Sequence, residues 1–409
     1  MNKFLKEFKD RGFFSQCTGE DDLSKLMDKK KINAYIGFDC TAESLHVGSL
    51  LQIMCLRLLQ KHGHRPIVLL GGGTTRIGDP SGKDKTRTIL SEDEIEKNIN
   101  NIGKILKNYL DDKNPKTKPI FVNNYSWLKS LNYISFLRDI GKHFTINKML
   151  SFDSVKTRLE REQSLSYMEF NYMILQAYDF LELNKKKNCV LQIGGSDQWG
   201  NIINGVDLIK KYSNNHAYGL TTPLITLASG AKMGKTESGA VWLDKKFLSA
   251  YDYWQFWRNI DDRDVLKFLK IFTDINVTEI EKIKNNDINE LKILLANKAT
   301  TMLHGKDGAK TSEETAKQTF TNNSMGDNLP IVSINKKQLN DKMSIIDLVI
   351  LSKFEQSKSE IRRLINGKGI RINNQVIINE KLIITKNLFK DNFLKLSLGK
   401  KRHIKVELS

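Results

Sequence analysis

The sequence predicts an α/β protein in which a parallel sheet covered by helices is followed by a helical domain and a small α+β domain. Residues 31–205 alternate short apolar runs with amphipathic helices, which is typical of a parallel sheet with helices on both faces. Residues 246–321 have a helical pattern throughout, and 409 residues are too many for one ordinary core. The expected domains are 1–246, 247–322 and 343–409, with an Asn-rich linker at 323–342.

Each element of the predicted sheet follows from its own run of residues. Helices are expected where apolar residues recur with helical spacing, at 1–14, 50–63, 94–110 and 167–183. Strands are expected where apolar residues form short runs, at 33–38, 65–73, 119–124 and 189–195. In such a sheet ligands bind beyond the carboxyl ends of the strands, so the residues after each strand are the candidate site.

The composition excludes several classes of protein. No run of 18 apolar residues is present, so no membrane span is expected. The N-terminal helix carries Glu7 and Asp10, unlike a secretory signal or a mitochondrial leader. The four cysteines form no CxxC pair, which argues against a zinc site and fits a reducing cytosol. We therefore expect a cytoplasmic protein without a protein-ligated metal.

The charge balance favours a polyanionic partner. The formal net charge is +18, and residues 343–409 hold 14 Lys and Arg against 6 Asp and Glu, so the basic excess is concentrated at the C-terminus. A Lys-rich and Asn-rich composition can also reflect genome bias. The charge alone therefore does not decide for a nucleic acid.

Two stretches have features that suit a phosphate. Residues 35–52, YIGFDCTAESLHVGSLLQ, predict a strand, a turn and a helix start, whose free N–H groups attract an anion. For that fragment alone, an ordinary strand-turn-helix corner with a surface His46 is the commoner explanation. Residues 71–87, GGGTTRIGDPSGKDKTR, have the glycines of a phosphate cradle without the P-loop spacing, so a floppy basic loop is the alternative.

Three polar residues share one face of the helix expected at 167–183. Tyr172, Gln176 and Asp179 are spaced i, i+4 and i+7. A phenol, an amide and a carboxylate are poor core material because each buried group needs a partner. A pocket wall is therefore favoured over a solvated stripe.

Two later stretches add polar groups near strand ends or loops. Residues 191–202, LQIGGSDQWGNI, predict a strand and a helix with Ser196 as N-cap, followed by Asp197 and Gln198, although an acid there is also an ordinary cap. In residues 232–239, KMGKTESG, Lys232 and Lys235 could reach a polyphosphate from a loop. Lysine pairs on loops are more often solvated.

The order of these motifs carries a resemblance. An HxGx helix start followed by KMxKx resembles the nucleotide-binding signatures of class I aminoacyl-tRNA synthetases. YIGFD, GDPSGK, YMILQAYDF, GGSDQWGNI and KMGKTESG together resemble the bacterial-type tyrosyl-tRNA synthetases, over the whole chain. The resemblance implies a Rossmann-like catalytic domain, a homodimer, and ATP with Mg²⁺. It also implies tyrosine–tRNA ligase activity: L-tyrosine and ATP give tyrosyl-adenylate and pyrophosphate, and the tyrosyl group then passes to the 3′ end of tRNA(Tyr).

The same resemblance implies roles for single residues. Those matched to the substrate tyrosine are Tyr35 and Asp179 at its phenol, and Asp79, Tyr172 and Gln176 at its α-ammonium group. Those matched to the ATP-binding helix start are His46, Gly48 and Ser49. Those matched to the adenosine and substrate carboxylate region are Gly37, Asp39, Thr41, Gly195, Asp197 and Gln198. Those matched to the departing pyrophosphate are Lys83, Arg87, Lys232, Lys235 and Thr236.

Two residues depart from the family pattern. Ser49 stands where the family usually has a second His, and Cys40 stands where it usually has Pro. Neither change removes a charge from the site. We therefore expect activity to survive with an altered affinity for ATP.

The C-terminal part resembles the S4 RNA-binding domain. Residues 357–377, SKSEIRRLINGKGIRINNQVI, begin with Ser357 and Glu360 at the spacing of a capping box, and Gly367 or Gly369 is the expected C-cap. Basic residues on a rigid helix contact RNA phosphates, although a charged, solvated helix is the alternative. The expected RNA-binding residues are Lys358, Arg362, Arg363 and Lys368.

Two rival functions remain open. A synthetase-like RNA-binding or splicing factor would have lost or supplemented catalysis, and the intact His46, Asp197, Lys232 and Lys235 argue against a loss. A synthetase for another aromatic acid is expected to lack a polar pair that only a phenol requires. The tryptophanyl relative shares the catalytic fold but lacks the S4-like domain.

Overall fold

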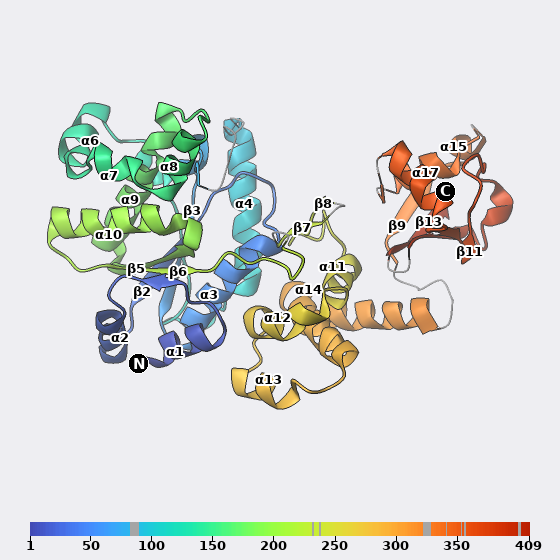
Figure 1. Cartoon of the computed structure of the whole chain (residues 1–409), viewed down its shortest axis with the longest axis horizontal. Coiled ribbons are helices and arrows are strands. Elements are labelled where there is room, and N and C mark those ends of the chain that lie inside the picture. Colours follow the sequence, from blue (N-terminus) through green and yellow to red (C-terminus); the bar gives the residue numbers. More distant parts are fainter. Residues whose placement is uncertain are drawn as a thin grey trace. The chain divides into compact units, whose positions relative to one another are not determined.

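A computed structural model describes residues 1–81, 90–230, 233–236, 239–321, 329–340, 342–352, 354–355, 357–399 and 402–409. Lys83, Arg87 and Lys232 lie outside these ranges. The chain divides into two compact units, Met1–Met233 with Leu266–Ile283, and Gly234–Val265 with Lys284–Ser409. The chain thus passes into the second unit at Gly234, returns to the first unit for residues 266–283, and passes into the second unit again at Lys284 (Figure 1). The finer domain boundaries expected from the sequence stay a prediction beside this division.

The first unit is built on a six-stranded sheet in the order β1-β6-β5-β2-β3-β4. Its strands are β1 (Gln16–Cys17), β2 (Asn33–Phe38), β3 (Arg65–Leu70), β4 (Ile120–Asn123), β5 (Cys189–Gly195) and β6 (Tyr218–Thr222). All neighbours pair in parallel except β1, which pairs antiparallel with β6 at the edge. The predicted parallel sheet is therefore confirmed, and the sequence missed the edge strand β1 and its neighbour β6.

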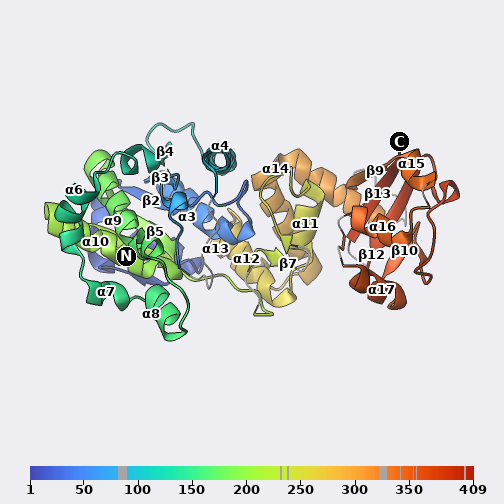
Figure 2. The ribbon, with the colours of Figure 1, turned by 90° about the horizontal axis from the view of Figure 1, so that it is seen from above.

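Helices cover both faces of this sheet. α9 (Tyr167–Lys187) and α10 (Trp199–Ser213) lie together on one face and α3 (Leu50–Lys61) lies on the other (Figures 1 and 2). The other helices of this unit are α1 (Lys3–Asp10), α2 (Glu20–Lys29), α4 (Glu92–Tyr109), α5 (Tyr125–Leu128), α6 (Tyr133–Asp139), α7 (Ile146–Leu150), α8 (Asp153–Glu160), α12 (Val265–Phe272) and α13 (Val277–Ile283).

The strand order reverses between β2 and β5. The chain passes from β2 to β3 on one side and from β5 to β6 on the other, so the two crossovers diverge from this adjacent pair. Their register places Tyr35 of β2 beside Ile67 of β3 and Gln192 of β5. A cleft at the carboxyl ends of β2 and β5 is the expected ligand site of such a sheet.

The second unit holds two kinds of structure. β7 (Lys235–Thr236) pairs with β8 (Gly239–Ala240), and α11 (Ala250–Arg258) and α14 (Ile288–Thr321) form its helical part, with α14 kinked at Gly305. The other part is a five-stranded sheet in the order β11-β10-β12-β13-β9 with three helices. Its elements are β9 (Ile331–Ile334), α15 (Lys336–Asn340), α16 (Ile345–Leu351), α17 (Lys358–Asn366), β10 (Ile370–Ile372), β11 (Gln375–Val376), β12 (Phe393–Leu398) and β13 (Arg402–Leu408).

β9 lies within the range 323–342, which the sequence predicts as a linker. The strand pairs in parallel with β13, and Ile334 at its end is buried in the core of the small sheet. Only one side chain of this strand is fully buried, so its apolar pattern is too short to stand out beside the Asn-rich residues before it.

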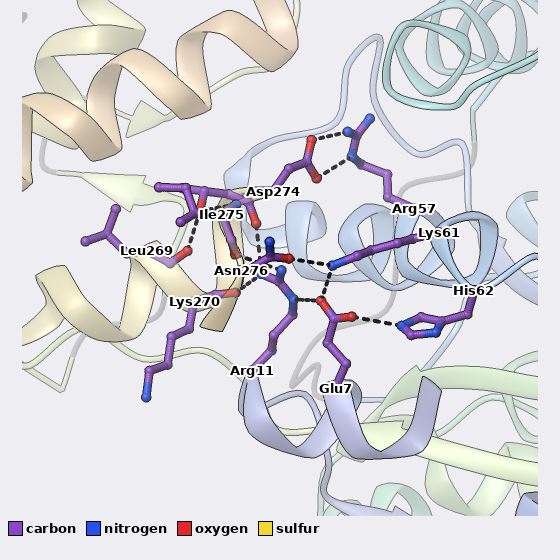
Figure 3. Close-up of polar contacts among 11 residues, drawn as sticks. Glu7, Arg11, Arg57, Lys61, His62, Leu269, Lys270, Asp274, Ile275 and Asn276 are labelled. Atoms are coloured by element: carbon purple, nitrogen blue, oxygen red, sulfur yellow. Dashed lines mark hydrogen bonds and ion pairs between the residues drawn. The ribbon is translucent and has the colours of Figure 1, made fainter. Parts of the chain in front are cut away.

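A polar cluster around Arg11 fastens the returning segment 266–283 to the first unit (Figure 3). The buried Arg11 guanidinium donates to the carbonyl oxygens of Lys270 at 2.7 Å, and of Thr273 and Ile275 at 2.9 Å each. These carbonyls end α12 and begin the turn before α13, where helix geometry leaves them without partners. One arginine thus caps this whole turn.

Glu7 completes the cluster from the same face of α1. Its carboxylate accepts from Arg11 at 2.8 Å and from Lys61 at 2.7 Å, and it contacts Nε2 of His62 at 2.8 Å. Burial raises the pKa of Glu7, but these three partners outweigh it and lower the pKa to about 2. The carboxylate is therefore charged over the whole physiological range.

Replacing Arg11 by Met should destabilise the first unit by about 3 kcal/mol. The change leaves three carbonyl oxygens without their donor and the Glu7 carboxylate without its buried cation. The shift in the urea midpoint of the intact chain measures the loss. Lys25→Met removes an exposed pair with Asp22 at 3.8 Å and should leave the midpoint unchanged. Equal shifts of the urea midpoint in the two variants would show that the Arg11 cluster contributes no more to stability than an exposed ion pair.

Candidate active site at the carboxyl ends of β2 and β5

A cavity of about 330 Å³ opens where β2 and β5 end. Most residues that the sequence assigns to a small-molecule site line it: Tyr35, Gly37, Asp39, Gly48, Ser49, Asp79, Tyr172, Gln176, Asp179, Gly195, Asp197 and Gln198. Thr41 and His46 are not among the lining residues. The structure therefore brings four separate stretches of sequence, 35–49, 79, 172–179 and 195–198, around one cavity.

Asp179 is a buried carboxylate at this cavity, and both its oxygens have donors. Nε1 of Trp127 donates to one oxygen at 2.7 Å and the amide of Asn124 donates to the other at 2.8 Å. Its side chain is only 2% exposed. Burial raises the pKa of Asp179 to about 7, although the two hydrogen bonds oppose the shift. Asp179 therefore changes its charge near neutral pH.

Tyr35, Gln52 and Gln192 carry unpartnered polar atoms of the cavity wall. Tyr35 and Gln192 are buried, and the Tyr35 hydroxyl and Oε1 of Gln52 and of Gln192 have no hydrogen-bond partner among the described residues. Burial raises the pKa of Tyr35, and the charge of Asp179 raises it further. An orphaned buried polar group costs about 1–3 kcal/mol, so three of them lining one cavity indicate a polar ligand.

A hydrogen-bond network joins Asp179 to Asp39 across the cavity. The Asn124 amide donates to Thr74 Oγ1 at 3.0 Å, and Thr74 donates to Asp39 at 2.8 Å. The second oxygen of Asp39 accepts from the Tyr172 hydroxyl at 3.0 Å. Residues that follow β2, β3 and β4 and a residue of α9 are thus fixed relative to one another.

A second hydrogen-bond network connects the side chains of Asp79, Gln176 and Gln198, which come from three different motifs. The Gln198 amide donates to Asp79 at 2.9 Å, and the Asn201 amide donates to the side-chain oxygens of Gln176 at 3.1 Å and Gln198 at 3.2 Å. Tyr172 and Asp179 are buried, and Gln176 is half-buried. The interpretation of this helix face as a solvated stripe is therefore wrong.

The HVGS helix start lies beside Met233, which belongs to the first unit. Nδ1 of His46 accepts from the Gly48 N–H at 2.9 Å at the start of a 3₁₀ turn, Val47–Ser49, which leads into α3. A Cβ on Gly48 would lie 2.5 Å from the His46 ring and 3.0 Å from the carbonyl oxygen of Met233. Gly48 is required by this close approach. The backbone of Lys235 and Thr236 forms β7 in the second unit.

The phosphate cradle or floppy loop expected at 71–87 stays a prediction, because residues 82–87 lie outside the described residues. A Cβ at Gly71 would lie 2.3 Å from Asp39 and one at Gly72 would lie 2.3 Å from Asn123. These glycines let the chain pack tightly behind Asp39. Ser196 is not the N-cap of α10: residues 196–198 form a 3₁₀ turn, and the helix begins at Trp199. That extra turn frees the Gln198 side chain to contact Asp79.

Sequence reasoning missed four residues that shape the cavity. They are Thr74, Asn124, Trp127 and Gln192. A signal existed for Gln192, which interrupts an otherwise apolar strand, and for Asn124, which directly follows β4. No sequence signal identifies Trp127, because an indole in a helix is ordinarily core.

A second cavity of about 390 Å³ borders the Arg11 cluster. Arg57 beside it pairs with Asp274, and Lys61 pairs with Glu7. Since these cations already have partners and the cavity includes none of the predicted site residues, the cavity at β2 and β5 is the better candidate. Within the described ranges, the structure contains neither a cluster of three metal-ligating side chains nor a helix long and apolar enough to cross a membrane.

The predicted RNA-binding residues lie on or directly after α17. Lys358, Arg362, Arg363 and Lys368 are exposed, while Ile361 and Ile365 anchor the other face. Ser357 is the N-cap, but its own N–H is bound by Glu355 at 2.9 Å, so only half of the expected capping box forms.

α17 ends at Asn366 with Gly367 as its C-cap, and Lys368 takes the left-handed conformation, with φ of 58°. Of the basic residues on this helix, Arg362 lies 3.5 Å from Glu380 and Arg363 lies 2.9 Å from Glu360.

Comparisons with known proteins show the family of this chain. A family model described as tRNA synthetases class I (W and Y) matches residues 27–321. The chain is 84% identical over 408 residues to the tyrosine–tRNA ligase of Pelagibacter ubique (strain HTCC1062), with 100% of both chains covered. It is 54% identical over 415 residues to the tyrosine–tRNA ligase of Wolbachia sp. subsp. Brugia malayi (strain TRS), covering 100% of this chain and 99% of that protein.

A solved structure is also similar. The C-terminally truncated mitochondrial tyrosyl-tRNA synthetase of Aspergillus nidulans matches with a TM-score of 0.70 and 31% identity, covering 78% of this chain and 94% of that chain. The match to the family model spans most of the chain, and the relatives align over its full length. The chain therefore belongs to the tyrosine–tRNA ligases, within the class I tRNA synthetases.

Proposed function

We propose that the cavity at the ends of β2 and β5 is where this tyrosine–tRNA ligase activates L-tyrosine. The observation that carries the assignment is the buried Tyr35 hydroxyl, which has no partner among the described residues and lies near the Asp179 carboxylate. A substrate phenol can donate its proton to Asp179 and accept from Tyr35. The Tyr35 hydroxyl then gains a partner, and Asp179 gains a third donor beside Asn124 and Trp127.

The other end of the cavity offers acceptors to the α-ammonium group of tyrosine. Asp79 contributes a carboxylate, Tyr172 a hydroxyl oxygen and Gln176 an amide oxygen, and all three line the cavity. An ammonium group has three donors, so three converging acceptors match it. Asp79 also adds the negative charge that such a cation requires.

ATP is assigned to the part of the cavity beside the α3 helix start. His46, Gly48 and Ser49 border this start, where N–H groups and the helix dipole favour phosphate. The remaining nucleotide contacts are proposed for Gly37, Asp39, Thr41, Gly195, Asp197 and Gln198. Contacts to pyrophosphate are proposed for Lys83, Arg87, Lys232, Lys235 and Thr236. Mg²⁺ enters with ATP as part of the substrate.

The chemistry places modest demands on the protein. The tyrosine carboxylate attacks the α-phosphorus of ATP. The bond between the α-phosphorus and the oxygen that bridges it to the β-phosphorus breaks, and pyrophosphate leaves. No covalent enzyme intermediate is required, so the residues act by alignment and by stabilising phosphate charge. Fixed networks around Asp39 and Asp79 supply that alignment.

The C-terminal part is assigned to tRNA(Tyr). We propose that Lys358, Arg362, Arg363 and Lys368 contact its phosphates, since all four are exposed on one small helix and the residue that follows it. We propose three domains: a catalytic domain at 1–246, a helical domain at 247–322 and an S4-like domain at 343–409. The strand β9 also belongs to the S4-like domain, because it pairs with β13. No feature of the described residues favours a splicing role over tRNA charging.

Homodimerisation is proposed from a set of exposed apolar side chains. Three short helices and the start of α9 carry them: Tyr133, Ile134, Leu137, Ile146, Leu150, Leu159 and Tyr167. Tyr133 and Tyr167 contact each other through their hydroxyls at 3.1 Å. A face with so much exposed apolar surface is typical of a subunit interface. A cytoplasmic location is proposed from the four free cysteines, three of them buried.

Amino-acid-dependent ATP–pyrophosphate exchange tests the function. Tyrosine should support rapid exchange, and phenylalanine should be slower in kcat/KM by at least about a hundredfold, because it leaves Tyr35 and Asp179 without their shared partner. The assay is run with each of the twenty amino acids. Equal exchange with phenylalanine and tyrosine would remove the assignment of these two residues.

The KM for tyrosine should depend on pH with an apparent pKa near 7. The pKa of Asp179 is raised to about 7, so the carboxylate that accepts the phenol proton is present above this pH and lost below it. The KM at pH 6 should therefore be about ten times that at pH 8. The KM for ATP in the same assay is the control and should stay level. An Asp179→Asn variant that keeps the same pH dependence would contradict the assignment.

Ending the chain after Thr321 should separate the two half-reactions. Every tyrosine and ATP residue named above precedes residue 240, so pyrophosphate exchange should stay near normal. Charging of tRNA should fall sharply, and the dependence of tRNA affinity on salt should become shallower, because a basic surface is lost. The cut is placed before β9, since β9 belongs to the C-terminal sheet. Undiminished charging by the shortened chain would show that this part is not the RNA-binding element.

A further inference from the structure

The first turn of α9 is fixed by a buried charged network outside the cavity. Ser166 is its N-cap: Ser166 Oγ accepts from the Glu169 N–H at 3.2 Å, and Glu169 accepts from the Ser166 N–H at 3.1 Å and from Oγ at 2.9 Å. These bonds form a complete capping box. They occupy one oxygen of the Glu169 carboxylate, Oε2.

Arg158 binds the other oxygen of Glu169. Its Nη1 donates to Glu169 Oε1 at 3.0 Å, and its Nη2 donates to the carbonyl of Ser164 in the turn between α8 and α9. The Arg158 and Glu169 side chains are only 3% and 2% exposed. Arg158 belongs to α8, a helix that contributes no residue to the cavity.

This ion pair is unusual because a simple helix cap needs no buried cation. Ser166 and the Glu169 carboxylate satisfy the helix start without help from Arg158. Burying two charges is costly, and a buried pair often adds no stability over apolar residues of similar size. A role other than stability is therefore the better explanation for it.

The position of Tyr172 indicates that role. Tyr172 follows Glu169 by three residues, so both lie on the same face of α9, one turn apart. Asp179 is two turns further along and is held separately by Asn124 and Trp127. A loosened first turn would therefore displace Tyr172 and leave the phenol end of the cavity in place.

We infer that Arg158 and Glu169 are positioning residues for the α-ammonium group of tyrosine. They lock the first turn of α9 so that the Tyr172 hydroxyl stays at Asp39 and faces the substrate. The inference rests on the proposed function, in which Tyr172 binds this ammonium group. It assigns a substrate-positioning role to a helix that does not touch the substrate.

Arg158→Met should raise the KM for tyrosine about tenfold in pyrophosphate exchange, because small displacements at a binding group are costly. The kcat and the KM for ATP should stay within about twofold, since a contact made equally in ground and transition states affects binding alone. The inhibition constant of 3-(4-hydroxyphenyl)propanoate should also be unchanged. This analogue keeps the phenol but lacks the ammonium group.

Two further variants keep the test decisive if Arg158→Met folds poorly. Arg158→Met combined with Glu169→Gln leaves no unpaired buried charge and should recover at least half of the lost tyrosine affinity. Lys156→Met on the same helix removes an exposed pair with Glu160 at 3.8 Å and should change nothing. Thermal melts of each variant report whether the fold is intact.

The outcomes separate this inference from the proposed function. A wild-type protein that gives no tyrosine-dependent exchange would remove the proposed function. A wild-type protein that activates tyrosine, with an Arg158→Met variant of unchanged tyrosine KM, would overturn only the positioning role. So would a variant whose inhibition constant for the analogue rises as much as its KM for tyrosine, because the whole cavity would then be disturbed.

Discussion

The buried carboxylate of Asp179 is the constraint around which the site is organised. A carboxylate with 2% exposure needs donors inside the fold, and the chain supplies Asn124 and Trp127 from the residues after β4. Asn124 then reaches Thr74, and Thr74 reaches Asp39. The hydrogen bonds that satisfy the Asp179 carboxylate thus fix the residues after β2, β3 and β4 relative to one another. The cavity is the space between these residues.

The parallel sheet and its covering helices could be predicted because their signals are local. β2 and β5 have the predicted bounds, and α9 shows its polar face at the spacing that placed Tyr172, Gln176 and Asp179 together. The assignment of a role to each residue required more than spacing. It came from the order of five motifs, which no periodicity explains.

The remaining features depend on contacts distant in sequence. Trp127 and Asp179 are 52 residues apart, and only the folded chain shows that an indole N–H meets a carboxylate. A Cβ on Gly71 would lie 2.3 Å from Asp39, which is 32 positions earlier, and the local sequence does not reveal this close approach. The strands β1 and β6 were missed because β1 has two residues and β6 is rich in Gly and Thr.

The cavity keeps polar groups that weaken the unliganded protein. Among the described residues, Tyr35, Gln52 and Gln192 have polar atoms without a partner, and burial raises the pKa of Asp179 to about 7. Under the proposed function, an apolar wall would be more stable but would bind phenylalanine as readily as tyrosine. The free energy that folding loses at these groups would then be recovered as selectivity for a phenol. Rigid surroundings are then essential, since a cavity able to relax would satisfy these groups internally. The networks around Asp39 and Asp79 and the charged lock on the first turn of α9 supply that rigidity.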